Sequence, residues 1–277
     1  YVYLFPTTKE GLTAAENAVA EMVKFVPGGI DAIGVWNEYQ NMSGPAFKGN
    51  YQYLADFHKA IYRGVKKGDP EVEVSGMEND WWGMYAWDDL NKVLELSNGE
   101  PVFDALSIHT YSQLQAEPEK GTGKQFSDDS KMLLEKYGKN KDMDIYATEG
   151  GWSETHVNFD RELHASYIIR NQAWHWAYDV ADRVCNYNLN DYPEYNSRSE
   201  MREARFGIME SYNKEGAEIP YLGKEAFVAA AYYNNLLADA EFTEFIDTGY
   251  AEDKAYAYRF RHRDGGDVLM MGPVENE

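Results

Sequence analysis

Two glutamates follow apolar segments of the sequence, at points where a strand would open into a loop. Glu38 ends the run G-V-W-N-E, and Glu149 ends I-Y-A-T-E and precedes two glycines and a tryptophan. Taken singly, each is most simply a loop glutamate that faces solvent. When two parallel strands carry glutamates at the same end, both carboxyl groups point into one mouth. Hydrolysis of a glycosidic bond needs such a pair, one group as acid and the other as nucleophile or base.

The elements that would position these glutamates alternate between strands and helices. Apolar runs predict strands at 1–5, 30–36, 72–76, 103–109, 144–148 and 183–189. Helical spacing of apolar residues predicts helices at 13–26, 51–65, 88–96, 127–137, 161–180 and 225–237, the first with a capping box of Thr13 and Glu16. This alternation indicates a parallel sheet wrapped by helices, and uninterrupted apolar strands are typical of a sheet buried on both faces.

The number of strand–helix units is two short of a (β/α)8 barrel. A doubly wound sheet is the alternative, but no Gly-rich phosphate loop follows 1–5, as a nucleotide-binding fold of that type would usually have. The polar and aromatic candidates all follow strand ends, where the sites of barrels are built. We therefore expect an α/β chain that forms a TIM (β/α)8 barrel without its first two strands.

The pattern changes after about residue 240. Tyr256, Tyr258 and Phe260 alternate with arginines, and the D-G-G-D run at 264–267 is a hairpin turn signal. We expect 1–240 to form the catalytic barrel domain with strands three to eight, and 241–277 to begin a small antiparallel β appendage.

Three motifs resemble those of clan A glycoside hydrolases. Trp36, Asn37 and Glu38 resemble the W-N-E signature after strand four, and the T-E-G-G-W run at 148–152 resembles the T-E-x-G-W signature after strand seven. The H-T-Y run at 109–111 resembles the H-x-Y signature after strand six. Their order and intervals fit that clan over 1–240, closest to family 39 or family 5. Many members have proline after Asn-Glu, where this sequence has Tyr39.

The resemblance implies a role for each residue of these motifs. Glu38 would be the acid/base, with its pKa raised by burial against Trp36 and by a second carboxylate. Glu149 would be the nucleophile of a glycosyl-enzyme intermediate. Asn37 would bind the sugar 2-hydroxyl, Tyr111 would orient Glu149, and His109 would line the sugar subsite.

Aromatic residues make up 15% of the chain, with 22 Tyr and 7 Trp. Aromatic rings stack on the apolar faces of sugars, so we expect Trp152 and one of Trp81 or Trp82 to be sugar platforms, with Asn79 beside them as a polar partner. Trp174 and Trp176 lie within a helical pattern, where core packing is the simpler interpretation.

Charge and composition exclude several classes of protein. The chain has 47 Asp+Glu against 26 Lys+Arg, a formal net charge of −21. A binder of nucleic acid needs a basic surface, and an acidic chain is disfavoured at an anionic membrane. No apolar run approaches the roughly 20 residues of a membrane span.

We expect neither a metal nor another cofactor. The single cysteine, Cys185, excludes a Cys-rich metal site, and it is expected to be a small buried residue in mid-strand. The sequence has no H-E-x-x-H zinc motif, no EF-hand loop and no G-x-S-x-G nucleophile elbow.

These observations favour a retaining glycoside hydrolase that cleaves β-glycosidic bonds in an oligo- or polysaccharide by double displacement at two glutamates. Two alternatives stay open: a carbohydrate-binding barrel without activity, and a transglycosylase that uses the same carboxylates. The sugar, its linkage, and exo or endo action are not specified by these residues. From the substrate class we expect a secreted or periplasmic protein. Because both ends interrupt apolar runs, we expect this chain to lack the N-terminal part of a longer one.

Overall fold

The computed structural model describes 6–38, 50–80, 84–112, 116–155, 160–192, 205–211, 221–251 and 254–274, with only the backbone described at 79, 80, 84–86 and 211. The chain forms two compact units. The first comprises Tyr1–His109, Gln125–Thr148 and Ala181–Arg183, and the second comprises Thr110–Lys124, Glu149–Val180 and Val184–Glu277.

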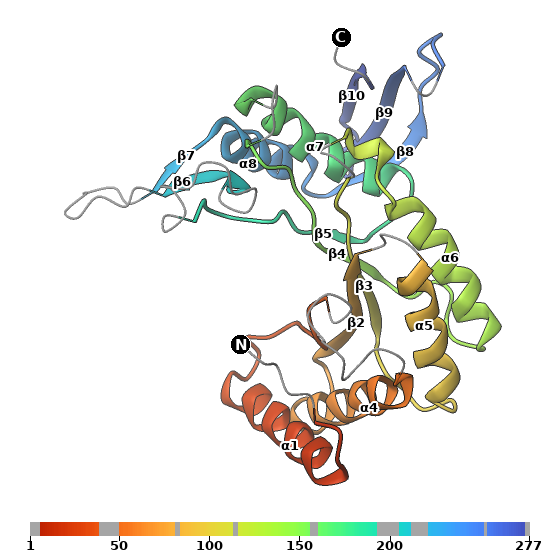
Figure 1. Ribbon diagram of the computed structural model, residues 1–277. Helices are drawn as coiled ribbons and strands as arrows, with labels where there is room; N and C mark the ends of the chain where they lie inside the picture. Colours follow the sequence, from red (N-terminus) through yellow and green to blue (C-terminus); the bar gives the residue numbers. More distant parts are fainter. Residues whose placement is uncertain are drawn as a thin grey trace. The chain divides into compact units, whose positions relative to one another are not determined.

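The first unit is built on a five-stranded sheet whose strands follow chain order (Figure 1). The strands are β1 (Ala32–Gly34), β2 (Glu73–Asp80), β3 (Ala105–His109), β4 (Ile145–Glu149) and β5 (Arg183–Val184). The β1–β2 and β2–β3 pairs are parallel. All five residues of β3 are buried, as expected for a parallel strand covered on both faces. The predicted parallel α/β sheet is therefore confirmed.

The helices of this unit are α1 (Lys9–Phe25), α4 (Tyr51–Gly68), α5 (Met84–Leu96) and α6 (Gly123–Lys136). In α4 the predicted apolar stripe is buried, including Leu54, Ile61 and Val65. Gly64 allows α4 to approach α1 closely, because a Cβ at this position would lie 2.4 Å from the backbone oxygen of Glu16.

The predicted start of α1 is wrong. The helix begins at Lys9, and Thr8 caps it by accepting a hydrogen bond from the Gly11 N–H at 3.1 Å. Thr13 lies inside the helix, where its hydroxyl donates to the Lys9 carbonyl at 2.9 Å. Similarly, α6 begins at Gly123, four residues before the start predicted at 127.

The second unit contains α7 (Arg161–Ala177), α8 (Glu225–Leu237) and the 3-10 helix η2 (Pro118–Lys120). Two short strands, β6 (Met209–Ser211) and β7 (Tyr221–Gly223), form an antiparallel pair. A separate three-stranded sheet has the order β10-β9-β8, with β8 (Ala240–Phe245), β9 (Ala255–His262) and β10 (Asp267–Pro273). Both pairs of that sheet are antiparallel, as predicted for the chain after residue 240. Tyr258 and Phe260 of β9 pack with Ala173 of α7 and Leu237 of α8.

Several predicted boundaries are different in the structure. The predicted strand at 1–5 lies outside the described residues, and β5 has two residues where seven were expected. Cys185 therefore follows the strand and is exposed, so its prediction as a buried mid-strand residue is wrong. The division into 1–240 and 241–277 stays a prediction. Among the described helices, none is long and apolar enough to cross a membrane.

Candidate active site

Glu38 follows the end of β1, in the first unit. Its backbone has a φ of 42°, and its N–H donates to the Glu78 carbonyl at 2.9 Å, which fixes the segment after β1 against β2. The Glu38 side chain is 22% exposed, so the carboxyl is shielded while it still reaches solvent. Trp36 is half-buried with its ring edge-to-face against Phe57 at 5.9 Å, and Asn37 is exposed.

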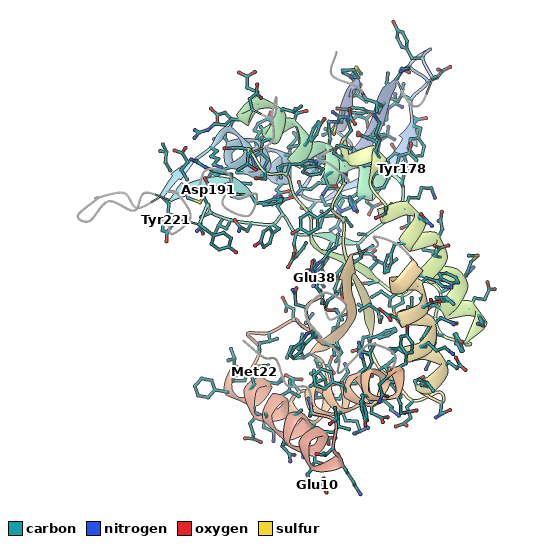
Figure 2. All side chains as sticks on the ribbon, in the orientation of Figure 1. Glu10, Met22, Glu38, Tyr178, Asp191 and Tyr221 are labelled. Carbon is teal, nitrogen blue, oxygen red and sulfur yellow. The ribbon has the colours of Figure 1, made fainter. Side chains whose placement is uncertain are left out.

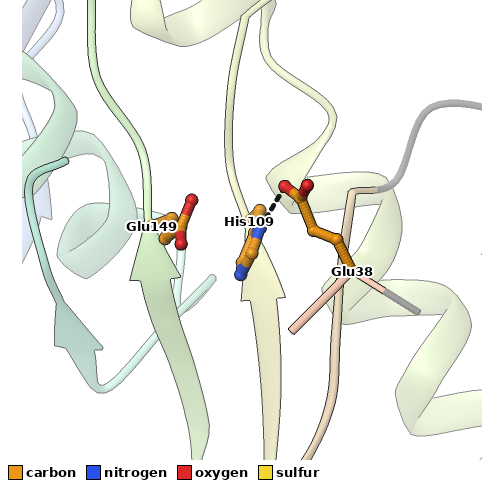
Figure 3. A group of neighbouring side chains, drawn as sticks. All are labelled: Glu38, His109 and Glu149. Carbon is orange, nitrogen blue, oxygen red and sulfur yellow. Dashed lines mark hydrogen bonds and ion pairs between the residues drawn. The ribbon is translucent and has the colours of Figure 1, made fainter. Parts of the chain in front are cut away.

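His109 ends β3 in the same unit and contacts Glu38. The imidazole is buried, with 1% exposure, and its Nδ1 lies 2.7 Å from Oε1 of Glu38 (Figure 3). Sequence reasoning expected His109 to line a sugar subsite. The structure instead shows a buried ring in direct hydrogen-bonding contact with the carboxyl group of Glu38.

Glu149 ends β4, and Tyr111 and Thr110, two of its hydrogen-bond partners, belong with it to the second unit. Tyr111 donates its hydroxyl to Oε2 of Glu149 at 2.8 Å, and the Thr110 N–H donates to the Glu149 carbonyl at 2.7 Å. The Tyr111 ring packs edge-on against Tyr187 and Phe206. A hydrogen-bond donor of this kind favours the ionised form of a carboxyl group.

The two glycines after Glu149 allow the close backbone contacts of this region. A Cβ at Gly150 would lie 2.6 Å from the Thr110 hydroxyl oxygen, and one at Gly151 would lie 2.2 Å from the Tyr187 carbonyl oxygen. Any larger residue would push these segments apart. Close packing therefore explains why both residues between Glu149 and Trp152 are glycines.

Of the predicted aromatic platforms, Trp152 belongs to the residues that the structure describes. Trp152 is fully buried, packs edge-on against Tyr167 and donates its Nε1–H to the Ala116 carbonyl at 2.9 Å. Because its ring has no exposed area, Trp152 cannot stack on a sugar in this structure, and its prediction as a sugar platform is wrong. Trp81 and Trp82 lie outside the described residues, and Asn79 lies on β2 with only its backbone described.

Sequence reasoning missed Glu78. This residue lies on β2, is only 7% exposed, and has its Oε2 3.8 Å from Nε2 of His109. The available signal was a carboxylate close to the end of an apolar strand, the same signal that identified Glu38. Its orientation depends on a bulge in β2, which the sequence pattern does not reveal.

A buried ionic cluster in the second unit was also missed. The Lys224 ammonium is buried and lies 3.0 Å from Asp191 Oδ1 and 3.1 Å from Glu154 Oε2, and His164 Nδ1 lies 3.2 Å from the other oxygen of Glu154 (Asp191 is labelled in Figure 2). Burial raises the pKa of Asp191. Burial also acts to raise the pKa of Glu154, but hydrogen bonds and charge from His164 and Lys224 outweigh it, and the pKa is lowered.

A hollow of about 770 Å3 lies elsewhere in the second unit. It is lined by aromatic rings, including Trp174, Tyr178, Tyr256 and Tyr258, and by the charged residues Glu119 and Lys124. None of the predicted site residues that the structure describes lines it. Trp174 is 5% exposed and Trp176 packs against the core, as their helical pattern predicted.

Comparison with known proteins identifies the fold. No protein-family model matches the sequence, and no curated protein matches it. Among solved structures, a family 39 glycoside hydrolase from the gut symbiont Bacteroides cellulosilyticus WH2 has a TM-score of 0.72 at 20% identity, over 98% of this chain and 53% of that chain. A glucosidase from Croceicoccus marinus has a TM-score of 0.62 at 15% identity, over 97% of this chain and 62% of that one. A monomeric beta-xylosidase from Caulobacter crescentus CB15 has a TM-score of 0.55 at 17% identity, over 94% of this chain and 52% of that one.

The chain thus spans about half the length of the family 39 structure that it matches. At these identities the likeness shows the fold alone, which is the TIM-barrel fold of these glycoside hydrolases over about half of their length. The resemblance inferred from the three sequence motifs is confirmed at this level.

Proposed function

We propose that this chain carries the active site of a retaining glycoside hydrolase that acts on β-linked oligo- or polysaccharides. The observation that supports this most strongly is the placement of two differently supported glutamates in one barrel fold. Glu38 follows β1 and contacts an imidazole, and Glu149 ends β4 and accepts a tyrosine hydroxyl. In a barrel, residues at the carboxyl ends of the strands form the active site.

In the proposed reaction Glu149 is the nucleophile. Its ionised carboxylate attacks the anomeric carbon and forms a glycosyl ester, while the bond from that carbon to the leaving oxygen breaks. The hydrogen bond from Tyr111 supports this role because it stabilises the carboxylate and fixes its orientation.

Glu38 is the proposed acid/base. Its carboxylic acid gives a proton to the leaving oxygen in the first step, and its carboxylate then takes a proton from the water that cleaves the ester. Partial exposure suits this double role, since the group exchanges protons with substrate and with water in turn. The contact with His109 supplies a second group that influences its protonation.

The substrate-binding residues are proposed from their proximity to these glutamates. Asn37 is exposed beside Glu38 and would bind the sugar 2-hydroxyl, and Trp36 is partly accessible. Trp81 and Trp82, which follow β2, and Asn79, near the end of β2, remain proposed contacts. Double displacement at two carboxyl groups needs no cofactor, and we propose that the protein acts outside the cytoplasm, where polysaccharides occur.

The test is turnover of a panel of aryl β-glycosides, including glucosides and xylosides, by the intact protein and its Glu149→Gln variant. We expect kcat to fall by about 10^3-fold or more, because the amide cannot form the ester. Asp144→Asn is the matched control, since this residue is exposed just before the same strand, and we expect it to retain activity.

Each outcome separates the candidate functions. Wild-type activity in Glu149→Gln would contradict the assignment of the nucleophile. Glycan binding without hydrolysis by the wild type would favour the binding-only barrel. Transfer of the sugar to an added sugar acceptor, in place of water, would identify a transglycosylase.

A further inference from the structure

The end of β2 contains a bulge that redirects Glu78. Gly76 pairs with Leu106 of β3 and Asn79 pairs with Ile108, so Met77 and Glu78 together oppose one residue. Both have left-handed backbones, with φ of 96° and 42°. Such conformations are unfavourable for side chains with a Cβ, and bulges that use them are common next to active sites because they re-aim a side chain.

The carboxyl group of Glu78 is held from several sides within the first unit. Oε1 accepts the Ser75 hydroxyl at 3.0 Å, and Oε2 accepts the Thr148 hydroxyl at 2.6 Å. A Cβ on Gly34 of β1 would lie 2.4 Å from Oε1, so the glycine provides the space that this carboxyl occupies. Three strands therefore contribute to one buried acidic group.

His109 of β3 faces this buried carboxyl group. Nε2 of His109 lies 3.8 Å from Oε2 of Glu78, a distance at which charge acts without a hydrogen bond. The other buried imidazole in this region, His58, does not supply a charge, because burial lowers its pKa to about 4 and leaves the ring neutral at pH 7. Carboxylates thus face both nitrogens of His109, Glu38 at Nδ1 and Glu78 at Nε2.

We propose that Glu78 is a positioning residue that acts through His109 on the acid/base Glu38. This inference rests on the proposed function. The Glu78 carboxylate favours the form of His109 that carries a proton on both ring nitrogens. Nδ1–H then donates to Oε1 of Glu38, and the proton that Glu38 exchanges with the glycosidic oxygen is carried on Oε2. Without Glu78, Nδ1 of a neutral ring can accept the acid proton of Glu38 and direct it away from the substrate.

The catalytic test compares two leaving groups on one aryl β-glycoside that the wild type hydrolyses. Phenol needs a proton as it departs, whereas 2,4-dinitrophenol departs without one. For Glu78→Gln we expect kcat to fall by about 10-fold or more on the phenyl glycoside and by less than about threefold on the dinitrophenyl glycoside, with KM nearly unchanged, because general acid catalysis contributes about 10^2–10^4-fold. We expect Glu78→Asp to recover part of the loss, since it retains the charge.

Glu73→Gln is the matched control. Glu73 lies at the other end of β2 and accepts a hydrogen bond from the Tyr146 hydroxyl. The variant therefore removes a carboxylate from the same strand at a position away from His109. We expect wild-type kcat for both leaving groups. Equal losses on the two substrates in Glu78→Gln, or a loss that only follows a lower melting temperature, would overturn the positioning role.

A second measurement needs no substrate and so separates this inference from the proposed function. We expect ring 15N chemical shifts to show His109 protonated on both nitrogens at pH 7 in the wild type, with a titration midpoint lower by about one pH unit or more in Glu78→Gln. A neutral His109 in the wild type, or an unchanged midpoint in the variant, would overturn the inference. If the expected shifts are seen in a protein that hydrolyses no glycoside, the proposed function fails and the pairing of Glu78 with His109 stands.

Discussion

At the scale of single residues, the two glutamates differ in what supports them. Glu38 contacts an imidazole, which is neutral or cationic depending on its protonation, whereas Glu149 accepts a hydrogen bond from a tyrosine hydroxyl. A general acid needs to gain and lose a proton, and a nucleophile needs to stay ionised. The two environments match the two roles that the motifs imply.

Removal of the Tyr111 hydroxyl tests how the proposed nucleophile Glu149 is supported. We expect Tyr111→Phe to lower kcat/KM by roughly 10–100-fold, since a hydrogen bond to a charged group contributes about 1.5–3 kcal/mol. Steady-state kinetics on an aryl β-glycoside measures this. Tyr187→Phe is the control, because its ring packs on Tyr111 while its hydroxyl contacts Tyr192 at 2.9 Å. Equal losses in the two variants would assign the effect to packing.

The sequence predicts Glu38, Glu149, His109 and Tyr111 as site residues, because each belongs to a short motif after a strand, and their roles stay a prediction. It was insufficient for Glu78, whose direction depends on a two-residue bulge that pairing with β3 creates. For Trp152 it was misleading, because a tryptophan beside a catalytic motif and one in a core have the same local pattern.

At the scale of elements, the segments that follow β4 and β5 are joined to the start of α8 by the buried ionic cluster. Glu154 comes five residues after β4 ends, Asp191 lies seven residues beyond β5, and Lys224 is the N-cap of α8. Asp191 also accepts the Gly207 N–H at 3.0 Å. One ammonium group therefore fixes three connections that are distant in sequence.

Replacement of Lys224 tests this role. We expect Lys224→Met to lower the free energy of unfolding at pH 7 by about 3–5 kcal/mol, because it leaves the buried Asp191 and the mostly buried Glu154 without the ammonium group that they share. The exposed Lys120→Met serves as control, with an expected change within about 0.5 kcal/mol. Urea unfolding measures both.

The pH dependence of this loss follows from Glu154. Its pKa is lowered in the folded protein, so the stability it contributes is fully present above the ordinary carboxyl value of about 4.3 and is lost as the pH falls through the lowered value. The contribution of Asp191 to stability depends on pH in the opposite direction, since burial raises its pKa. We expect the deficit of Lys224→Met to shrink toward pH 4, where protonated carboxyl groups no longer need a cation. A deficit that is constant with pH would contradict a charge-based role.

Element types were predicted well from periodicity, and boundaries less well. The fully buried β3 and the stripe of α4 follow directly from their apolar spacing. The start of α1 was misassigned because Thr8 and Thr13 are both acceptable caps, and packing of α1 against α4 decides how much of the segment is helical. The short β5 could not be predicted, since an apolar run shows that a segment can be buried without showing that it is paired.

At the scale of the molecule, the chain has the TIM-barrel fold of the glycoside hydrolases that it resembles, and its last three described strands form an antiparallel sheet. Its net charge of −21 is compatible with many soluble substrates and identifies none. The fold class could be predicted because the alternation of strands and helices constrains it strongly. Whether Glu38 and Glu149 act in one reaction depends on the whole barrel, so a chemical experiment is the most direct test.

The most direct test is covalent trapping of the proposed intermediate. The intact protein is incubated with 2,4-dinitrophenyl 2-deoxy-2-fluoro-β-glucoside or the corresponding xyloside, in which the fluorine slows hydrolysis of the glycosyl ester, and the digested protein is examined by peptide mass spectrometry. The account predicts one fluorosugar per chain, attached to Glu149. A fluorosugar attached to any other residue would contradict it.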